Sequence, residues 1–240
     1  MALDFAAAYD ELNPDDRDHR FYAARAAELG ATRVLDLGCG TGALSLRLAS
    51  GGLTVVGIDP DAGMLRTAAR RPGADRVDWR LGYSDRAGTA SADFAVMSGH
   101  VAQVFVDDAQ WSRTLRDLHR ALVPGGTLAF ESRNPSARAW ERWTREATLR
   151  TVDAPEGPVE FWHETAEVTL PLVAYDTLTR SRRTGEETSN REVLAFRDAP
   201  TLVRDLEAAG FETVSLYGDW TRSPLTPAAP EIIVTARRRP

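Results

Sequence analysis

The sequence predicts an α/β fold in which a mostly parallel sheet is covered by helices on both faces. Short β-branched or apolar segments alternate with helix-like segments over the first two thirds of the chain. A glycine-rich bend separates the first predicted strand from the helix that follows it. The length of 240 residues allows one domain of this kind with an insertion.

The elements of this part follow in regular order. Helices are expected at residues 17–29, 43–49, 62–71 and 110–122, and strands at residues 33–37, 54–58, 77–81, 93–97 and 127–131. Glycine or proline closes several of them, as at Gly30, Gly51 and Pro72. Strands that alternate with helices favour parallel pairing, with both faces of the sheet buried.

The pattern changes after the fifth predicted strand. Segments 145–152, 159–175 and 189–197 are rich in Thr, Val and Glu with partial alternation, which predicts antiparallel strands joined by turns at 155–158 and 184–185. Asp198 is then expected to cap a helix that stops at Gly210, followed by strands at 214–217 and 231–236. We therefore expect a single domain, 1–240, with an antiparallel insertion at about 138–197.

Composition excludes several function classes. The formal net charge of -6 and the pI of about 5.3 argue against a nucleic-acid partner. All 29 basic residues are arginine, so an internal Schiff-base lysine is excluded. With a single cysteine, Cys39, no membrane-length apolar run and no secretory pattern at the N-terminus, we expect a cytoplasmic protein, and the Ala/Arg-rich bias favours a bacterial source.

The glycine bend is the most informative stretch. It reads Val34 to Gly42, VLDLGCGTG, and its glycines allow the backbone to approach a ligand closely. The spacing of Gly38 and Gly40 also fits the dinucleotide fingerprint. Asp36 separates the two interpretations, because its charge would repel a pyrophosphate but suits the cationic amino-acid end of S-adenosylmethionine.

A second acid supports a nucleoside ligand. Asp59 ends the second strand, where a carboxylate accepts hydrogen bonds from ribose hydroxyls. Pro60 and Met64 follow and offer apolar cover to an adenine.

With these motifs in order, the chain resembles the class I (Rossmann-like) S-adenosylmethionine-dependent methyltransferases. The matching segments are VLDLGCGTG at 34–42, VVGIDPDAGML at 55–65 and ALVPGGTLAFESRNP at 121–135. The resemblance implies a seven-stranded sheet in the order 3-2-1-4-5-7-6, with the last strand antiparallel. It also implies that the insertion after strand 5 is a substrate cover or a dimer surface, in a monomer or a homodimer.

The resemblance also implies the cofactor site. S-adenosylmethionine, with S-adenosylhomocysteine as its product, is expected to contact Tyr9, Asp36, Gly38, Cys39, Gly40, Thr41, Gly42, Asp59, Pro60, Met64, Tyr83, Ser84, Ser98 and Gly99. Tyr9 belongs to an N-terminal segment that either folds over the cofactor as a lid or only packs. Tyr83 stands where the family often has an acid that reaches the adenine, so backbone at Tyr83 and Ser84 is the expected contact.

Candidate acceptor residues follow strands four and five. His100 titrates near neutrality and is the candidate general base, although backbone bonding alone would also explain it. Gln103, Arg133, Asn134, Trp162 and His163 are the candidate substrate-binding residues, with Arg133 suited to an anionic group. A structural role stays open for each, and the four histidines show no metal-ligand spacing, so no metal is expected.

These observations predict methyl transfer to an O or N atom of a small organic acceptor. Two alternatives remain at this point: a nicotinamide-dependent oxidoreductase, because the glycine spacing overlaps, and a non-catalytic cofactor-binding module.

Overall fold

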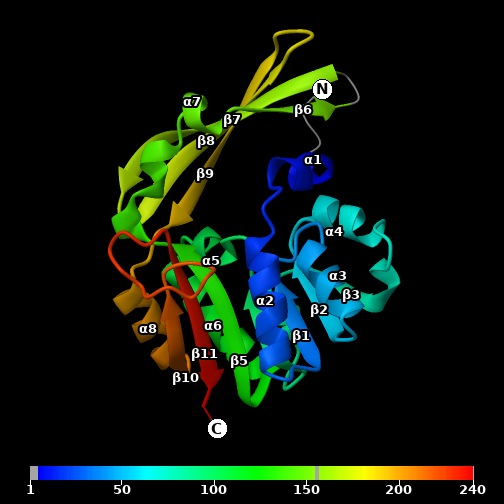
Figure 1. The fold of residues 1–240 in the computed structure, drawn as a ribbon, viewed down its shortest axis with the longest axis vertical. Helices are drawn as coiled ribbons and strands as arrows, with labels where there is room; N and C mark the ends of the chain where they lie inside the picture. The colour runs from blue at the N-terminus through cyan, green and yellow to red at the C-terminus, as the bar shows by residue number, and fades with distance from the viewer. Residues whose placement is uncertain (1–4, 155–156, 240) are drawn as a thin grey trace.

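A seven-stranded sheet forms the centre of the computed structural model, which describes residues 5–154 and 157–239 (Figure 1). Its order is β10-β11-β5-β4-β1-β2-β3. The strands are β1 (Arg33–Leu37), β2 (Thr54–Asp59), β3 (Val77–Leu81), β4 (Ala92–Met97), β5 (Leu122–Arg133), β10 (Phe211–Tyr217) and β11 (Glu231–Arg238). Within the described chain, β11 is the one strand of this sheet whose direction is opposite to that of the others, so its pairs with β5 and β10 are antiparallel. Because β10 and β11 are the sixth and seventh strands of this sheet, the predicted order is confirmed.

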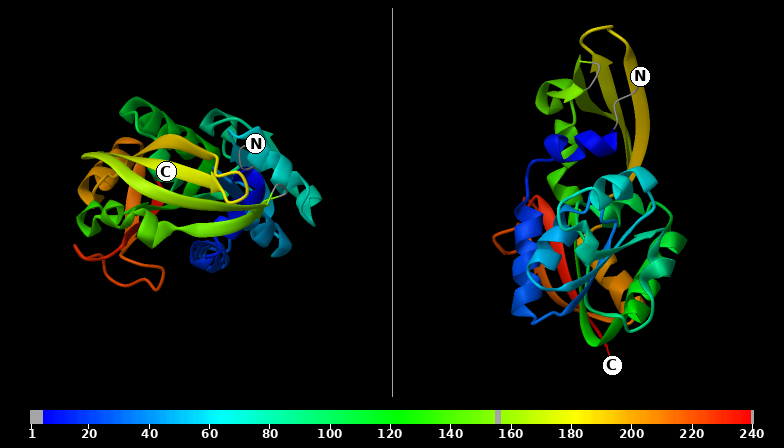
Figure 2. Two further views of the ribbon diagram at one scale, coloured as in Figure 1. Left: turned by 90° about the horizontal axis from the view of Figure 1, so that it is seen from above. Right: turned by 90° about the vertical axis from the view of Figure 1, so that its right-hand side faces the viewer.

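Helices cover both faces of this sheet (Figure 2). The helices of the described chain are α1 (Phe5–Leu12), α2 (Arg17–Glu28), α3 (Ala43–Ser50), α4 (Ala62–Ala69), α5 (Val101–Val104), α6 (Asp108–Ala121), α7 (Arg145–Thr148) and α8 (Ala199–Ala208), of which α1 and α7 lie outside the two layers on this sheet. Short 3-10 helices lie at Ala74–Arg76, Ser84–Ala87, Pro135–Ala137 and Ala139–Arg142. Neighbouring positions of one strand serve opposite faces: Leu35 packs with α6 and α8, and Val34 packs with α2 and α3.

Side-chain caps set several helix starts. Asp198 accepts a hydrogen bond from the backbone N–H of Thr201 at 2.9 Å, as expected for the N-cap of α8. Asp61 and Asp107 cap α4 and α6 in the same way.

The insertion forms a second, four-stranded antiparallel sheet. Its strands, in the order β6-β7-β8-β9, are β6 (Arg150–Ala154), β7 (Gly157–Thr169), β8 (Leu172–Ser181) and β9 (Glu187–Ala195). The predicted antiparallel insertion is confirmed, with two corrections. Residues 145–148 are helical because Thr144 caps that turn, and segment 159–175 is two strands joined by a turn. The expected turn at 155–158 lies partly outside the described residues.

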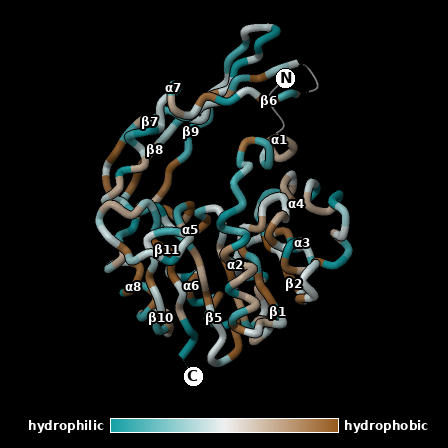
Figure 3. Tube along the Cα trace, viewed as in Figure 1, coloured by the Kyte–Doolittle hydropathy of each residue, from teal (hydrophilic) through white to brown (hydrophobic). Residues whose placement is uncertain are grey.

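The second sheet stands over the carboxyl edge of the first, and α1 lies between them (Figures 1 and 2). The hydrophobic stretches concentrate in the strands of the large sheet, and the tip of the β8–β9 hairpin is hydrophilic (Figure 3). Phe5 and Tyr9 both belong to α1. In α1, Phe5 stacks on Phe161 of β7 with ring centres 6.2 Å apart.

No helix within the described ranges is long and apolar enough to span a membrane. The cytoplasmic location, the monomer or homodimer and the lack of a nucleic-acid partner stay predictions.

Candidate functional site

The glycine loop between β1 and α3 folds back onto β2. The backbone N–H groups of Gly38 and Cys39 both donate to the carbonyl of Ile58, at 2.7 and 3.1 Å. Gly38, Gly40 and Gly42 all have positive φ angles, of 76°, 53° and 78°. A side chain at any of these positions would strain the backbone, which explains the glycines at this bend.

Only one of these glycines leaves open space where a side chain would be. A Cβ at Gly38 would lie 2.4 Å from Val101, and a Cβ at Gly42 would lie 2.4 Å from Trp79. A Cβ at Gly40 would meet nothing within 4 Å, and Gly40 lines a large cavity. Close packing therefore requires glycine at Gly38 and Gly42, and Gly40 is the glycine whose Cβ position faces open space.

Asp36 lies beneath this loop and is fully buried. Its Oδ2 accepts a hydrogen bond from the Ser45 hydroxyl at 2.6 Å, and its Oδ1 has no partner in the described part of the chain. Burial raises the pKa of Asp36 to about 7. A buried carboxylate with a free oxygen beside an open backbone cradle fits a ligand with a cationic amino-acid end. It acts from behind the loop, because Asp36 does not line the cavity.

Asp59 supports the same loop. Its Oδ2 accepts from the N–H of Gly40 and its Oδ1 from the N–H of Asp61, both at 2.8 Å. Each oxygen keeps a second lone pair, so ribose binding by Asp59 stays a prediction. The other residues predicted for the adenine end also lie outside the cavity lining: Pro60, Met64, Tyr83 and Ser84. Tyr83 is 58% exposed, and the hydroxyl of Ser84 donates to Asp117 of α6 at 2.7 Å.

The cavity has a volume of about 860 Å³ and extends from the glycine loop to the four-stranded sheet. It brings together half of the predicted site residues: Tyr9, Gly38, Cys39, Gly40, Thr41, Ser98, Gly99, His100, Arg133 and His163. The remaining ten lie outside its lining.

His100 lies in the loop that follows β4, at the carboxyl edge of the large sheet. It has a positive φ of 63° and directly precedes α5. Its backbone N–H donates to Oε1 of Glu131 at 2.6 Å, and its Nε2 lies 3.0 Å from Oε2 of Glu231. Burial and the nearby Arg133 lower the pKa of His100, so the neutral imidazole is favoured.

Arg133 projects into the same cavity from the end of β5. Its Nη1 donates to Oε1 of Gln103 at 2.9 Å, and its guanidinium lies 5.6 Å from the centre of the Trp143 ring. No carboxylate within the described ranges forms an ion pair with it. By contrast, the buried Arg197 pairs with Asp108 at 2.8 Å.

Three predicted substrate-binding residues lie elsewhere, and we correct their assignment. Gln103 is buried behind Arg133 and contacts its guanidinium. The side-chain amide of Asn134 donates to the carbonyls of Thr226 and Ala229, so it fixes the loop before β11. Trp162 alternates with His163 along β7 and therefore points to the opposite face of the sheet, where Arg145 lies 4.7 Å from its ring centre.

His163 does face the cavity. Its Nδ1 lies 3.1 Å from the Thr177 hydroxyl, and its ring packs against Phe161 and Tyr175. Burial lowers its pKa to about 4, so it is neutral at neutral pH.

Two acids at the centre of the site were not predicted. Glu131 is fully buried in β5, accepts from the hydroxyl of Tyr22, and has its pKa raised to about 8 by burial. A charged residue inside the apolar run 127–131 is a signal that sequence reasoning could have used. Glu231 gives no such signal, because only the pairing of β11 with β5 brings it opposite Arg133.

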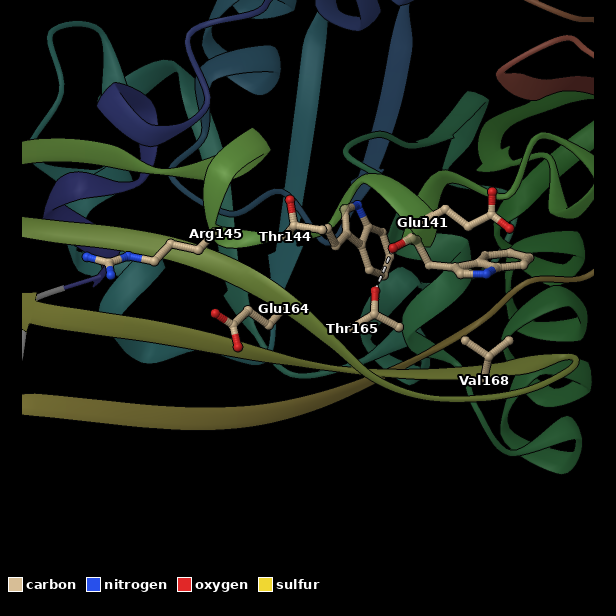
Figure 4. Close-up of a pocket in the computed structure, with 8 residues that line it drawn as sticks. Glu141, Thr144, Arg145, Glu164, Thr165 and Val168 are labelled. Atoms are coloured by element: carbon tan, nitrogen blue, oxygen red, sulfur yellow. Dashed lines mark hydrogen bonds between the residues drawn. The ribbon is translucent and has the colours of Figure 1, made fainter.

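A second hollow, of about 540 Å³, lies between residues 139–145 and β7 (Figure 4). Trp143 lines both spaces, and the Thr165 hydroxyl donates to the carbonyl of Trp140 at 2.6 Å. None of the predicted site residues lines it. Across the described ranges, no group of three or more His, Cys, Asp or Glu side chains is placed to hold a metal ion.

Comparison with known proteins finds methyltransferases among the similar sequences and structures. Residues 34–126 match the family described as "Methyltransferase domain". The ubiquinone/menaquinone biosynthesis C-methyltransferase UbiE of Desulfotalea psychrophila is 32% identical over 142 residues, covering 55% of this chain and 56% of the relative. The ubiquinone biosynthesis O-methyltransferase of Agrobacterium fabrum is 33% identical over 156 residues, covering 61% and 59%. The chain thus spans about half the length of the curated relatives that it matches.

Solved structures share the whole fold. The CcbJ methyltransferase from Streptomyces caelestis has a TM-score of 0.81 at 21% identity and covers 98% of this chain and 96% of its own. CalS10, an amino pentose methyltransferase from Micromonospora echinaspora that was solved with S-adenosylmethionine bound, has a TM-score of 0.72 at 21% identity and covers 99% and 98%. These findings confirm the predicted fold, and the match over residues 34–126 agrees with the predicted resemblance.

Proposed function

We propose that this chain is a class I, S-adenosylmethionine-dependent methyltransferase and that it methylates an O or N atom of a small organic acceptor; the match of residues 34–126 to a methyltransferase domain supports this proposal. The observation that carries the proposal is one continuous cavity, which joins the open backbone at Gly40 to the polar side chains of β7, β8 and β9. Its size suits a cofactor and a small acceptor side by side.

The glycine-loop end of the cavity is the proposed cofactor half. Backbone at Gly38 to Thr41, together with Ser98 and Gly99, would hold the amino-acid end, with the charge of Asp36 behind it. S-adenosylmethionine, when bound, supplies an activated methyl group on a positively charged sulfur. A pyrophosphate is disfavoured here because Asp36 and Asp59 both lie beneath the loop, which counts against a nicotinamide cofactor.

The other end is the proposed acceptor half. Arg133 offers a partly buried guanidinium without an ion-pair partner in the described chain, which suits an anionic group of the acceptor. His100 stands between the two halves as the general base. A base at this place favours acceptors that must lose a proton from oxygen or nitrogen.

The first experiment compares ligands by titration calorimetry. S-adenosylhomocysteine should bind the wild-type protein, and NADH should not. Tight binding of NADH would overturn the proposal in favour of an oxidoreductase.

The second experiment uses two glycines that share a positive φ. Gly40→Ala and Gly52→Ala both place an alanine in a left-handed conformation, at an expected cost of about 1 kcal/mol of stability. Only Gly40 lines the cavity, so only Gly40→Ala should weaken binding of S-adenosylhomocysteine, by about 100-fold or more. Equal affinities in the two variants would mean that the ligand does not contact this loop.

Catalysis is then tested with isotope-labelled S-adenosylmethionine and a panel of small amines, hydroxy acids and phenols. Label should appear on at least one amine or hydroxyl acceptor. A protein that binds S-adenosylhomocysteine yet labels only a carbon acceptor would contradict the O or N assignment.

A further inference from the structure

His100 is contacted by two acids from different strands, of which Glu131 is buried and Glu231 is partly buried. Glu131 of β5 accepts from its backbone N–H at 2.6 Å, and Glu231 of β11 contacts its Nε2 at 3.0 Å. Glu131 is itself bonded by the hydroxyl of Tyr22 in α2. Glu131, supported by Tyr22, therefore holds the backbone of His100, and Glu231 contacts its imidazole.

The backbone at His100 is also constrained. A positive φ of 63° is uncommon for a residue with a side chain and persists where the surroundings compensate for it. The bond from its N–H to Glu131 supplies that compensation, so the ring is presented from a fixed point at the end of β4.

The contact with Glu231 selects the tautomer of the ring. A carboxylate oxygen accepts hydrogen bonds, so Nε2 must be the donor in this pair. Nδ1 then carries the lone pair. It has no hydrogen-bond partner in residues 5–154 and 157–239, and the imidazole lines the cavity.

We infer that Glu231 is a positioning residue that keeps the proton of His100 on Nε2 and thereby aims the basic Nδ1 at the acceptor. The inference rests on the proposed function, since it assigns the base for that methyl transfer. The acceptor lone pair forms the new bond to the methyl carbon, and the carbon–sulfur bond breaks with its electron pair left on sulfur. The proton of the acceptor passes to Nδ1, and Glu231 stabilises the resulting imidazolium.

The charges around the ring set its titration. Glu231 faces it from β11, Glu131 and Arg133 from β5, and Asp18 from α2. Burial and Arg133 lower the pKa of His100, and Glu231 and Asp18 raise it. Arg133 lies directly opposite Glu231 in the strand register, yet the side chain of Glu231 is bonded to His100.

The test is a nitrogen-15 NMR titration of the histidines in the whole protein, which reports tautomer and pKa without an acceptor. The chain has four histidines, and His100→Gln identifies the signal of His100. His19, His119 and His163 serve as internal references. In the wild-type protein at neutral pH, we expect His100 to carry its proton on Nε2. A proton on Nδ1 would overturn the inference, and this result needs no variant of Glu231.

Two matched variants extend the test. Glu231→Gln should move the titration midpoint of His100 to lower pH, because the charge that favours the imidazolium is gone, and should mix its tautomers. Glu192→Gln removes another cavity-lining acid, one that is bonded to Tyr175, and should leave the signal of His100 unchanged. An unchanged tautomer and midpoint in folded Glu231→Gln would also overturn the inference.

Activity measurements distinguish failure of this inference from failure of the proposed function. With any acceptor that is labelled, His100→Gln should lower kcat by about 100-fold and Glu231→Gln by about tenfold, with binding of S-adenosylhomocysteine unchanged. Glu231→Asp should recover part of the loss. A wild-type kcat in Glu231→Gln would defeat the inference alone, whereas failure of the wild-type protein to bind S-adenosylhomocysteine would defeat the proposed function.

Discussion

The carboxyl edge of the seven-stranded sheet and the four-stranded sheet above it line one cavity, but they are constructed differently. At the edge, the ligand surface consists of backbone at Gly38 to Thr41, supported by buried acids. On the four-stranded sheet, the surface consists of side chains such as His163 and Tyr175. The first surface depends on the conformation of one loop, and the second on which strands pair.

The two regions also differ in their cores. The large sheet is buried between two extensive apolar clusters, which include Phe130 and Val34. The apolar cluster of the insertion is smaller and comprises Trp140, Val173, Leu194 and Phe196 within the described residues. The insertion therefore rests on a smaller apolar cluster than the large sheet does.

The largest expected effect is a loss of stability, tested by making the same Phe→Ala substitution in both cores. Phe130 and Phe196 are both buried, and each packs edge-on against a tryptophan. Phe130→Ala should lower the free energy of unfolding by about 3–5 kcal/mol. Phe196→Ala should cost about 2 kcal/mol less than that, because a small cluster relaxes around the gap more readily. Urea denaturation followed by circular dichroism measures both.

Binding of S-adenosylhomocysteine sharpens this comparison. Phe196→Ala should retain wild-type affinity, because the cofactor half does not depend on the small core. Equal losses of stability and affinity in the two variants would show that the sheets form one cooperative core.

The glycine loop and its two acids could be located from the sequence because local rules determine them, whereas the residues that bind the cofactor stay a prediction. Glycines at a strand-to-helix bend, Asp36 within the strand before it and Asp59 at the next strand end are all readable from spacing. Glu131 and Glu231 are exactly one hundred residues apart in sequence, and only strand pairing brings both to His100.

The acceptor half was less predictable for a related reason. Trp162 and His163 are neighbours in the sequence, but the alternation of a strand sends them to opposite faces. The sequence alone does not decide which face meets the cavity. Gln103 and Asn134 follow strand ends that reach the cavity, yet their side chains bond to protein partners.

A second prediction tests the charge behind the glycine loop. The pKa of Asp36 is raised to about 7, so its carboxyl is mostly protonated at pH 6 and mostly ionised at pH 8. The ammonium of S-adenosylhomocysteine is attracted to the ionised form, so affinity should rise by up to about tenfold between these pH values. Stability of the free protein should change in the opposite direction, being greatest below the ordinary pKa of an aspartate and declining as pH rises through 7.

Asp36→Asn is the matched variant for this prediction. It should bind S-adenosylhomocysteine with nearly the same affinity at pH 6 and pH 8, and more weakly than the wild-type protein at pH 8. Calorimetry in two buffers of different ionisation enthalpy counts the protons released. A pH dependence that persists unchanged in Asp36→Asn would assign the titration to another group, such as Glu131.

The smallest expected effect concerns α1, the helix that touches both regions. Asp10 of α1 accepts from the hydroxyl of Thr41 in the glycine loop at 2.7 Å and forms an ion pair with Arg71, which follows α4. Asp10→Asn keeps an acceptor for Thr41 but loses the ion pair. Because Asp10 is half-exposed, the change should weaken S-adenosylhomocysteine binding only about two- to fivefold.

A neighbouring acid provides the control for Asp10. Asp15 also lines the cavity but pairs with Arg17 and makes no contact with the glycine loop. Asp15→Asn should therefore leave affinity unchanged, and stopped-flow measurement should show faster ligand release in Asp10→Asn alone. Equal release rates in both variants would mean that α1 does not retain the ligand, and the coupling between the two halves would then run only through the side chains of β7 to β9.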